Sequence, residues 1–191
     1  MRISIFGMAA LLAAVPPLAQ ADQTSQARAL SSELVQQLGA VLKKELAANG
    51  PEGAISVCRD MAPAIAGELS RRSGNRVARV SLRPRNPLLG EPDEWEQRVL
   101  ADFDRRAASG EKPDSMEFAE TVTEPLGRYF RYMKALPVQP LCLTCHGTAE
   151  NISDRVKQKL AIEYPRDRAT GYQLGQVRGA ITIKQPLDGA D

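Results

Sequence analysis

The sequence contains very little histidine, cysteine or aromatic residue. Its 191 residues include one histidine, His146, and three cysteines, Cys58, Cys142 and Cys145, and aromatic residues make up 5% of the chain. A single histidine excludes any metal site that takes two imidazoles from one chain. Three cysteines cannot all pair in disulfides, so at least one thiol needs another explanation.

The chain also lacks an excess of charge of either sign and, after its first residues, a long apolar run. Lysine and arginine number 25 against 23 acidic residues, for a net charge of +2. A nucleic-acid partner would favour a basic surface, so none is indicated. Charged residues interrupt every later apolar stretch, whereas a membrane-spanning helix needs about 20 predominantly apolar residues. We therefore expect no membrane span in the rest of the chain.

Residues 1–21 have the pattern of a Sec-type signal peptide. Arg2 precedes an apolar run over residues 3–18, and small residues lead to an expected cleavage site after Ala21. Cleavage there would leave a mature chain of residues 22–191 in the periplasm. That length suits a single domain with a moderate core.

Apolar residues repeat with helical spacing in the first part of the mature chain. Leucines three and four positions apart predict a helix over residues 24–49, which an Asn-Gly-Pro sequence should end. A second helical pattern covers residues 52–72, and Pro63 within it should kink the helix or start a new one near Cys58. A third pattern predicts a helix over residues 93–108.

Elsewhere, apolar and polar residues alternate with period two. Residues 78–83 and 177–184 predict strands with one face open to solvent, and residues 116–122 and 128–134 are further candidate strands. Residues 137–148 should interrupt the sheet as a loop. Because helices come first and no repeat or long linker divides the chain, we predict one α+β domain with an antiparallel sheet and flanking helices.

The sequence Cys142-Leu143-Thr144-Cys145-His146 carries the strongest functional signal. Covalent attachment of haem c needs two thiols with two residues between them, followed directly by a histidine for the iron. The only histidine of the chain lies immediately after this cysteine pair. A redox-active dithiol would be expected in a thioredoxin-like context, and a zinc site would need more ligands. We therefore predict one covalently bound haem c with His146 as an axial ligand of the iron.

The second axial ligand must be something other than histidine. The candidates are Cys58, Met61, Met116 and Met133, a lysine, or an open position that holds water. Cys58 and Met61 lie three residues apart on the apolar face of one predicted helix. The alternative interpretations are a buried inert thiol for Cys58 and core packing for Met61.

Several motifs spread over the mature chain occur together in a known family. They are Ala54-Ile55-Ser56-Val57-Cys58, Ala62-Pro63-Ala64-Ile65-Ala66, Leu82-Arg83-Pro84-Arg85-Asn86-Pro87, Cys142-Leu143-Thr144-Cys145-His146-Gly147, and Tyr164-Pro165 with Gly171-Tyr172. With these motifs the chain resembles exported single-domain haem c proteins, catalogued as a domain of unknown function. The resemblance implies a PAS-like fold and Cys/His ligation of the iron, with Cys58 as the distal ligand, Cys142 and Cys145 bound to the haem, and His146 as the proximal ligand.

The ligand set that the resemblance implies is chemically reasonable. A thiolate bound to iron is withdrawn from disulfide exchange, which would explain an unpaired cysteine in an exported protein. An anionic ligand also stabilises ferric iron, so the reduction potential should be low. Arg83, Arg85 and Asn86 either contact the haem propionates or cap the following turn.

These observations favour a redox-responsive haem protein of the periplasm that transfers single electrons or senses redox state. It would need the cytochrome c maturation machinery and a redox or sensor partner protein whose identity the sequence does not specify. The alternative is a CO or NO sensor in which the Cys58 ligand is displaced on reduction. A peroxidase would need a distal acid–base group, so we expect no enzyme activity. If the haem motif is misread, a structural or adaptor protein is the remaining interpretation.

Overall fold

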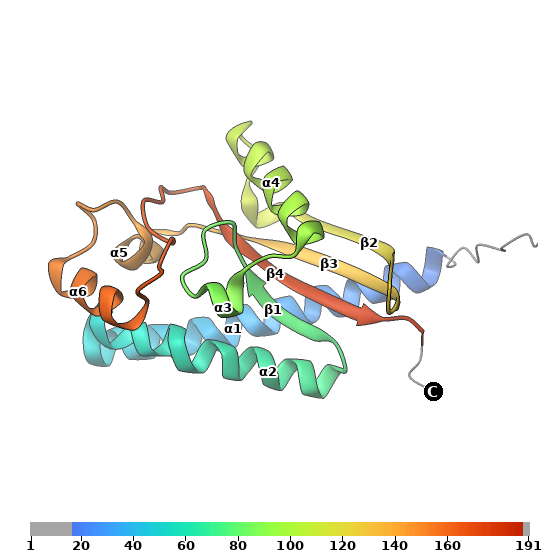
Figure 1. Cartoon of the computed structure of the whole chain (residues 1–191), viewed down its shortest axis with the longest axis horizontal. Helices are drawn as coiled ribbons and strands as arrows, with labels where there is room; N and C mark the ends of the chain where they lie inside the picture. Colours follow the sequence, from blue (N-terminus) through green and yellow to red (C-terminus); the bar gives the residue numbers. More distant parts are fainter. Residues whose placement is uncertain (1–16, 189–191) are drawn as a thin grey trace, which may run out of the picture.

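A four-stranded antiparallel sheet with helices on both faces forms the centre of the structure, a computed structural model that describes residues 17–188 (Figure 1). The strands lie in the order β1 (Arg76–Val80), β4 (Val177–Pro186), β3 (Gly127–Pro137) and β2 (Glu117–Glu124). All neighbouring strands are antiparallel. The predicted α+β class, with helices first, is confirmed, and the PAS-like description stays a prediction.

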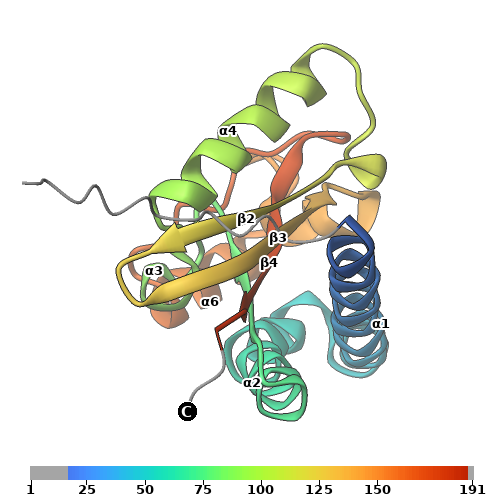
Figure 2. The same ribbon diagram turned by 90° about the vertical axis from the view of Figure 1, so that its right-hand side faces the viewer.

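Two long helices, α1 (Pro17–Ser56) and α2 (Ala62–Ser73), cover one face of the sheet (Figure 2). Gly50 breaks the helical geometry of α1 with φ +69°, but the helix resumes directly afterwards. The predicted end of the first helix at Asn49-Gly50-Pro51 is therefore confirmed: α1 consists of two helical segments that meet in a kink at Gly50. Pro51 is compatible with this continuation because its missing N–H costs little in the first turn after a break.

Between α1 and α2 the chain forms a π-helical turn, η1 (Val57–Met61), which contains Cys58. The backbone N–H of Ala62 donates to the carbonyl of Val57, the long spacing of a π turn. Pro63, in the first turn of α2, has no N–H with which to continue an ordinary α-helical ladder. The predicted kink or new helix start near Cys58 is confirmed.

Helix α4 (Glu94–Ala108) covers the opposite face of the sheet (Figure 2). Asp93 caps it through a reciprocal capping box with Glu96. The prediction that one face of the sheet is open to solvent was wrong, because α4 covers it. Thr182, a polar residue read as facing water, is satisfied internally: its hydroxyl is fully buried and donates to the Glu96 carboxylate over 2.8 Å.

Three of the four predicted strands have close to their expected extents, whereas β1 begins and ends earlier than residues 78–83. The backbone N–H of Arg83 donates to the hydroxyl of Ser81 over 3.1 Å, forming a turn directly after Val80. A local hydrogen bond of this kind competes with the strand ladder. The alternation of apolar and polar residues thus continues to residue 83, although β1 ends at Val80.

The predicted loop over residues 137–148 contains two short helical turns, η3 (Pro140–Cys142) and α5 (Leu143–His146). Helix α6 (Asp154–Glu163) follows, and the sequence analysis missed it. Its signal was present: Ser153 caps it, and its buried residues Val156 and Leu160 lie four positions apart. The remaining short elements are α3 (Pro87–Gly90) and η2 (Pro113–Ser115).

The predicted signal peptide, residues 1–21, lies largely outside the described residues, so the structure does not test it. Among residues 17–188, no helix combines the length and the apolar character that crossing a membrane requires.

Replacing Phe103 with Ala should lower the free energy of unfolding by about 3–5 kcal/mol, because the substitution leaves a cavity under α4. The Phe103 side chain is fully buried among core residues of α4 and the sheet. Chemical unfolding followed by circular dichroism measures the change. Leu126→Ala serves as the control, since Leu126 is 90% exposed, and its effect should stay within about 0.5 kcal/mol. Equal effects from both variants would contradict this description of the core.

Candidate functional site

The Cys-x-x-Cys-His motif lies beyond one end of the sheet, in the segment that connects β3 to β4. Helices α5 and α6 lie there, next to the C-terminal end of α1 (Figure 1). Gly147 closes the motif, and its N–H donates to the carbonyl of Leu143 over 2.9 Å. A Cβ at position 147 would lie only 2.6 Å from that oxygen and 2.8 Å from Cβ of Asn151. The tight turn after the histidine therefore needs glycine.

Cys142 and Cys145 are half-buried, unpaired thiols. Cys142 packs against the apolar cluster of Val138, Ala169 and Tyr172, whereas Cys145 packs against the cluster that contains Ile55, Ile152, Val156, Leu160 and Tyr164. Burial raises the pKa of the Cys145 thiol above its ordinary value, and the nearby Cys58 and Glu52 act in the same direction. The Cys145 sulfur is therefore a neutral thiol at neutral pH.

One edge of the His146 imidazole is engaged by the protein. Its Nδ1 lies 2.7 Å from the carbonyl oxygen of Ala169 and 3.1 Å from Nε of Arg178. Burial holds the pKa of His146 well below its ordinary value, and the positive charges of Arg178 and Arg85 act in the same direction. The ring is therefore neutral at neutral pH, the form that binds metal ions. In the tautomer whose Nδ1–H donates to the carbonyl of Ala169, Nε2 is the ligand atom.

A buried ion pair holds the motif against the segment that precedes β4. Arg85 is 8% exposed, and its Nε donates to Asp167 over 3.1 Å. The same guanidinium donates to the carbonyl of Cys145 and, at 3.4 Å, to that of Ala169. The carboxylate of Asp167 also accepts from the N–H of Ala169 over 2.7 Å. Arg85 thus joins α5 to the residue whose carbonyl contacts His146.

The other two residues suggested for the propionates have different surroundings. Asn86 accepts a hydrogen bond from the N–H of Leu88 over 3.1 Å, so it caps α3. The guanidinium of Arg83 lies 3.7 Å from the centre of the Tyr172 ring, in a cation–π contact. Contact of Arg83, Arg85 or Asn86 with a propionate stays a prediction.

The structure places Cys58 close to the motif. Arg59, the next residue, forms an ion pair with Glu163 of α6, which ties the π turn to the helix beside Cys145. Burial raises the pKa of Tyr164 and of Cys145, and the charge of Cys58 acts in the same direction on both, so Cys58 lies near these two side chains. The ion pair and this proximity bring η1, α5 and α6 together around a common region.

The three methionine candidates are placed less favourably. Met61 is 43% exposed, on the same turn as Cys58. Met116 and Met133 are fully buried in the cluster under α4, together with Phe103. No residue of the Cys-x-x-Cys-His motif belongs to that cluster.

Arg79 is a charged residue of this region that the sequence analysis missed. It lies opposite Ile181 in the register of β1 and β4, and therefore on the face covered by α1 and α2. Its charge acts on His146, Tyr164 and Arg178. Within residues 17–188, no hydrogen bond or ion pair engages its guanidinium. The alternating pattern contained Arg79 but assigned it to a solvent-exposed face.

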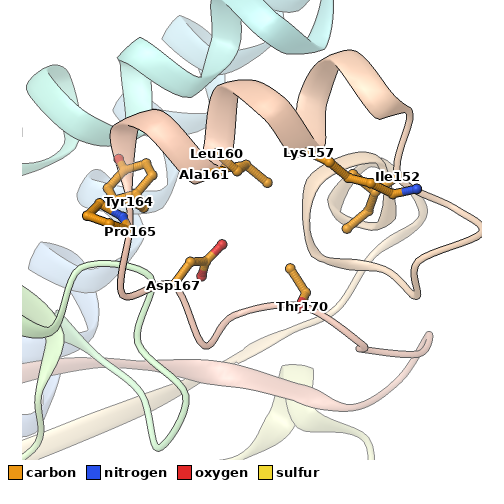
Figure 3. A pocket seen from close by; sticks show the side chains of 8 residues that line it. All are labelled: Ile152, Lys157, Leu160, Ala161, Tyr164, Pro165, Asp167 and Thr170. Atoms are coloured by element: carbon orange, nitrogen blue, oxygen red, sulfur yellow. The ribbon is translucent and has the colours of Figure 1, made fainter.

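A cleft of about 380 Å³ opens beside the site, between α6 and the segment that follows it (Figure 3). Asp167 and Thr170 lie across the cleft from Leu160 and Ala161 of α6 (Figure 3). Residues of the cluster around Cys145 form part of the wall. The complete lining is Ile152, Lys157, Leu160, Ala161, Tyr164, Pro165, Asp167 and Thr170.

The donor set of the site fits haem c better than a bare metal ion. Nowhere in the described chain do three or more His, Cys, Asp or Glu side chains come together as they would around a metal ion. Haem c requires two unpaired thiols on one short turn, followed by a neutral imidazole whose Nε2 can bind iron, and these groups are present. Arg79 also offers a positive charge for a haem propionate.

Comparison with known proteins identifies the family. The Tll0287-like family model matches residues 18–186. The chain belongs to the Tll0287-like family. A solved structure described as the cyanobacterial heme-protein Tll0287 matches with a TM-score of 0.62 and 21% identity, over 93% of this chain and 100% of that one. At this identity the likeness shows a shared fold. No curated protein matches the chain.

The match supports the family resemblance drawn from the sequence motifs, and it extends over the whole fold from α1 to β4. Neither comparison tests the individual site residues. Cys/His ligation and covalent attachment in this member of the Tll0287-like family are therefore proposals.

The stability of the haem-free chain should fall as the pH drops below about 6.5, the ordinary pKa of histidine in an unfolded chain. The unfolded chain binds a proton there, whereas folded His146, with its depressed pKa, does not. The limiting slope is about 1.4 kcal/mol per pH unit. Chemical unfolding between about pH 7 and pH 5.5 measures it, above the range in which carboxylates ordinarily titrate.

His146→Gln is the matched control, because His146 is the only histidine. This variant should have a nearly flat profile over the same interval. A flat wild-type profile would contradict the assignment of a buried neutral imidazole.

Proposed function

We propose that this member of the Tll0287-like family is a monohaem c-type cytochrome of the periplasm that senses redox state or transfers single electrons. The observation that carries the proposal is the His146 ring, held at Nδ1 by the carbonyl of Ala169 and placed directly after two unpaired thiols. The description of the related structure as a heme-protein supports haem as the cofactor.

Each ligand role is assigned to a residue of the described site. Cys142 and Cys145 would form thioether bonds, and His146 would bind iron through Nε2 as the proximal ligand. Cys58 would be the distal ligand, since its turn is tied to α6 through Arg59 and its thiol interacts with Cys145. Bound haem c would supply one-electron chemistry at iron.

The haem propionates need positively charged partners in a partly buried site. Arg79 is a candidate, because it is half-buried on the face of the sheet toward α1 and α2 and has no carboxylate partner among the described residues. Arg85 already pairs with Asp167. The structure thus favours Arg79 over Arg85 for this role.

The proposed function includes no catalysis, because no second histidine is present to act as a distal acid–base group. A separate redox or sensor partner protein would bind to the surface of this protein. The cytochrome c maturation machinery would attach the haem after export.

A CO or NO sensor is the second candidate, and the position of Cys58 favours it. A π turn is a local irregularity in a helix, and such turns often occur at functional sites. A ligand held on such a turn could leave the iron on reduction. CO binding to the reduced protein, with displacement of Cys58, separates this function from simple electron transfer.

Expressed with a cytochrome c maturation system, the protein should carry one haem that withstands acid acetone extraction. The pyridine haemochrome spectrum should be that of haem with two thioether bonds. Changing both Cys142 and Cys145 to Ala should abolish attachment. His146→Gly should leave part of the haem attached but change its spin state. Haem that extracts freely from the wild type would overturn the proposed function.

Cys58→Ser should change the ferric absorption spectrum and raise the midpoint potential, because it removes an anionic donor that stabilises ferric iron. The wild type should be low-spin with a sulfur-to-iron charge-transfer band. Met61→Leu is the matched control on the same turn and should change neither property. A Cys58→Ser protein with the wild-type ferric spectrum would show that Cys58 is only a half-buried thiol.

A further inference from the structure

The Nδ1 atom of His146 has two competing partners from different parts of the fold. The carbonyl of Ala169, at 2.7 Å, requires Nδ1 to carry a proton and donate it. The Nε–H of Arg178, at 3.1 Å, requires Nδ1 to be unprotonated and accept. A neutral imidazole satisfies only one of these contacts at a time, because each corresponds to a different tautomer.

Arg178 is held in this position by contacts that do not involve His146. Its Nη1 donates to the hydroxyl of Ser81 over 3.1 Å and to the carbonyl of Arg83 over 3.3 Å. Its guanidinium carbon lies 5.3 Å from the centre of the Tyr172 ring. The guanidinium is therefore anchored to the turn after β1 and to the aromatic ring beside His146.

The charge of Arg178 is not neutralised by an ion pair. Among residues 17–188, no carboxylate lies within ion-pair distance of it, whereas Arg85, another guanidinium whose charge acts on the ring, pairs with Asp167. Arg178 therefore presents a net positive charge to the Nδ1 edge of His146.

We propose that Arg178 is a positioning residue for His146: it competes with Ala169 for Nδ1, weakens the imidazole as an electron donor, and raises the midpoint potential of iron bound at Nε2. This inference rests on the proposed function in taking His146 as the proximal ligand. A metal at Nε2 selects the tautomer that donates to Ala169. The Nε–H of Arg178 then loses its acceptor, and its positive charge is left beside a ring that donates electron density to the iron.

The positive charge of Arg178 should raise the midpoint potential of the iron. Oxidation of the iron adds one positive charge, and a nearby fixed cation in a poorly solvated site disfavours that state. Arg178 would thus oppose the distal thiolate, which stabilises the ferric state. The two sides of the site would set the potential by opposite electrostatic effects.

The potential is tested with Arg178→Met in the haem-loaded full chain, measured by redox titration. The midpoint should fall below that of the wild type, and Arg178→Lys, which keeps the charge, should recover most of the difference. Arg168→Met is the matched control: Arg168 adjoins Ala169 in the chain, but its guanidinium pairs with Glu91, so the midpoint should not change. An unchanged or raised midpoint in Arg178→Met, at equal haem content, would overturn the proposal.

A second measurement needs no haem. In a Cys142→Ser, Cys145→Ser chain with ¹⁵N-labelled histidine, NMR reports on His146 alone, because the chain has no other histidine. Removing Arg178 should shift the tautomer population toward Nδ1–H, and Arg168→Met should not. An identical population with and without Arg178 would refute the competition. If the wild type carries no covalent haem, the proposed function fails, and this measurement still decides the inference.

Discussion

The buried ion pair between Arg85 and Asp167 is the interaction on which the site depends. Its two residues come from the turn after β1 and the segment before β4, 82 positions apart in the chain. Through the carbonyls of Cys145 and Ala169, the pair fixes both the motif turn and the acceptor for His146. Removing one partner would leave an uncompensated charge in a poorly solvated place, which costs far more than the pair contributes.

The sheet and the helices packed on its two faces hold the Cys-x-x-Cys-His turn in place at one end of the sheet. Helices α1 and α2 on one face and α4 on the other leave the sheet with two packed surfaces, so the ends of β3 and β4 are held firmly. The segment that connects β3 to β4 can then contain short helical turns while Cys142, Cys145 and His146 keep their positions. The Cys58 turn reaches the same region because α1 extends past the end of the sheet and its continuation is tied to α6 by Arg59 and Glu163.

The sequence predicted the fold class, the α4 helix and three of the four strands well because their patterns depend on local periodicity. It placed Cys142, Cys145 and His146 on one turn because adjacency in the chain requires it. The half-buried position of Arg79 was missed because alternation identifies two faces of a strand without showing what covers each. The partners of Arg85 and Arg178 come from distant segments, so no spacing in the sequence could indicate them.

The long separation between the parts of the site has a kinetic consequence. Arg59 and Glu163 are 104 positions apart, and loop-closure entropy must be overcome before such contacts become favourable. Contacts between distant segments form more slowly than local ones. Slow closure of such contacts would keep the two thiols of the motif accessible in the unfolded chain while the local helices form. For the proposed attachment of haem through thioether bonds, slow closure would leave time for the reaction before the fold encloses the sulfur atoms.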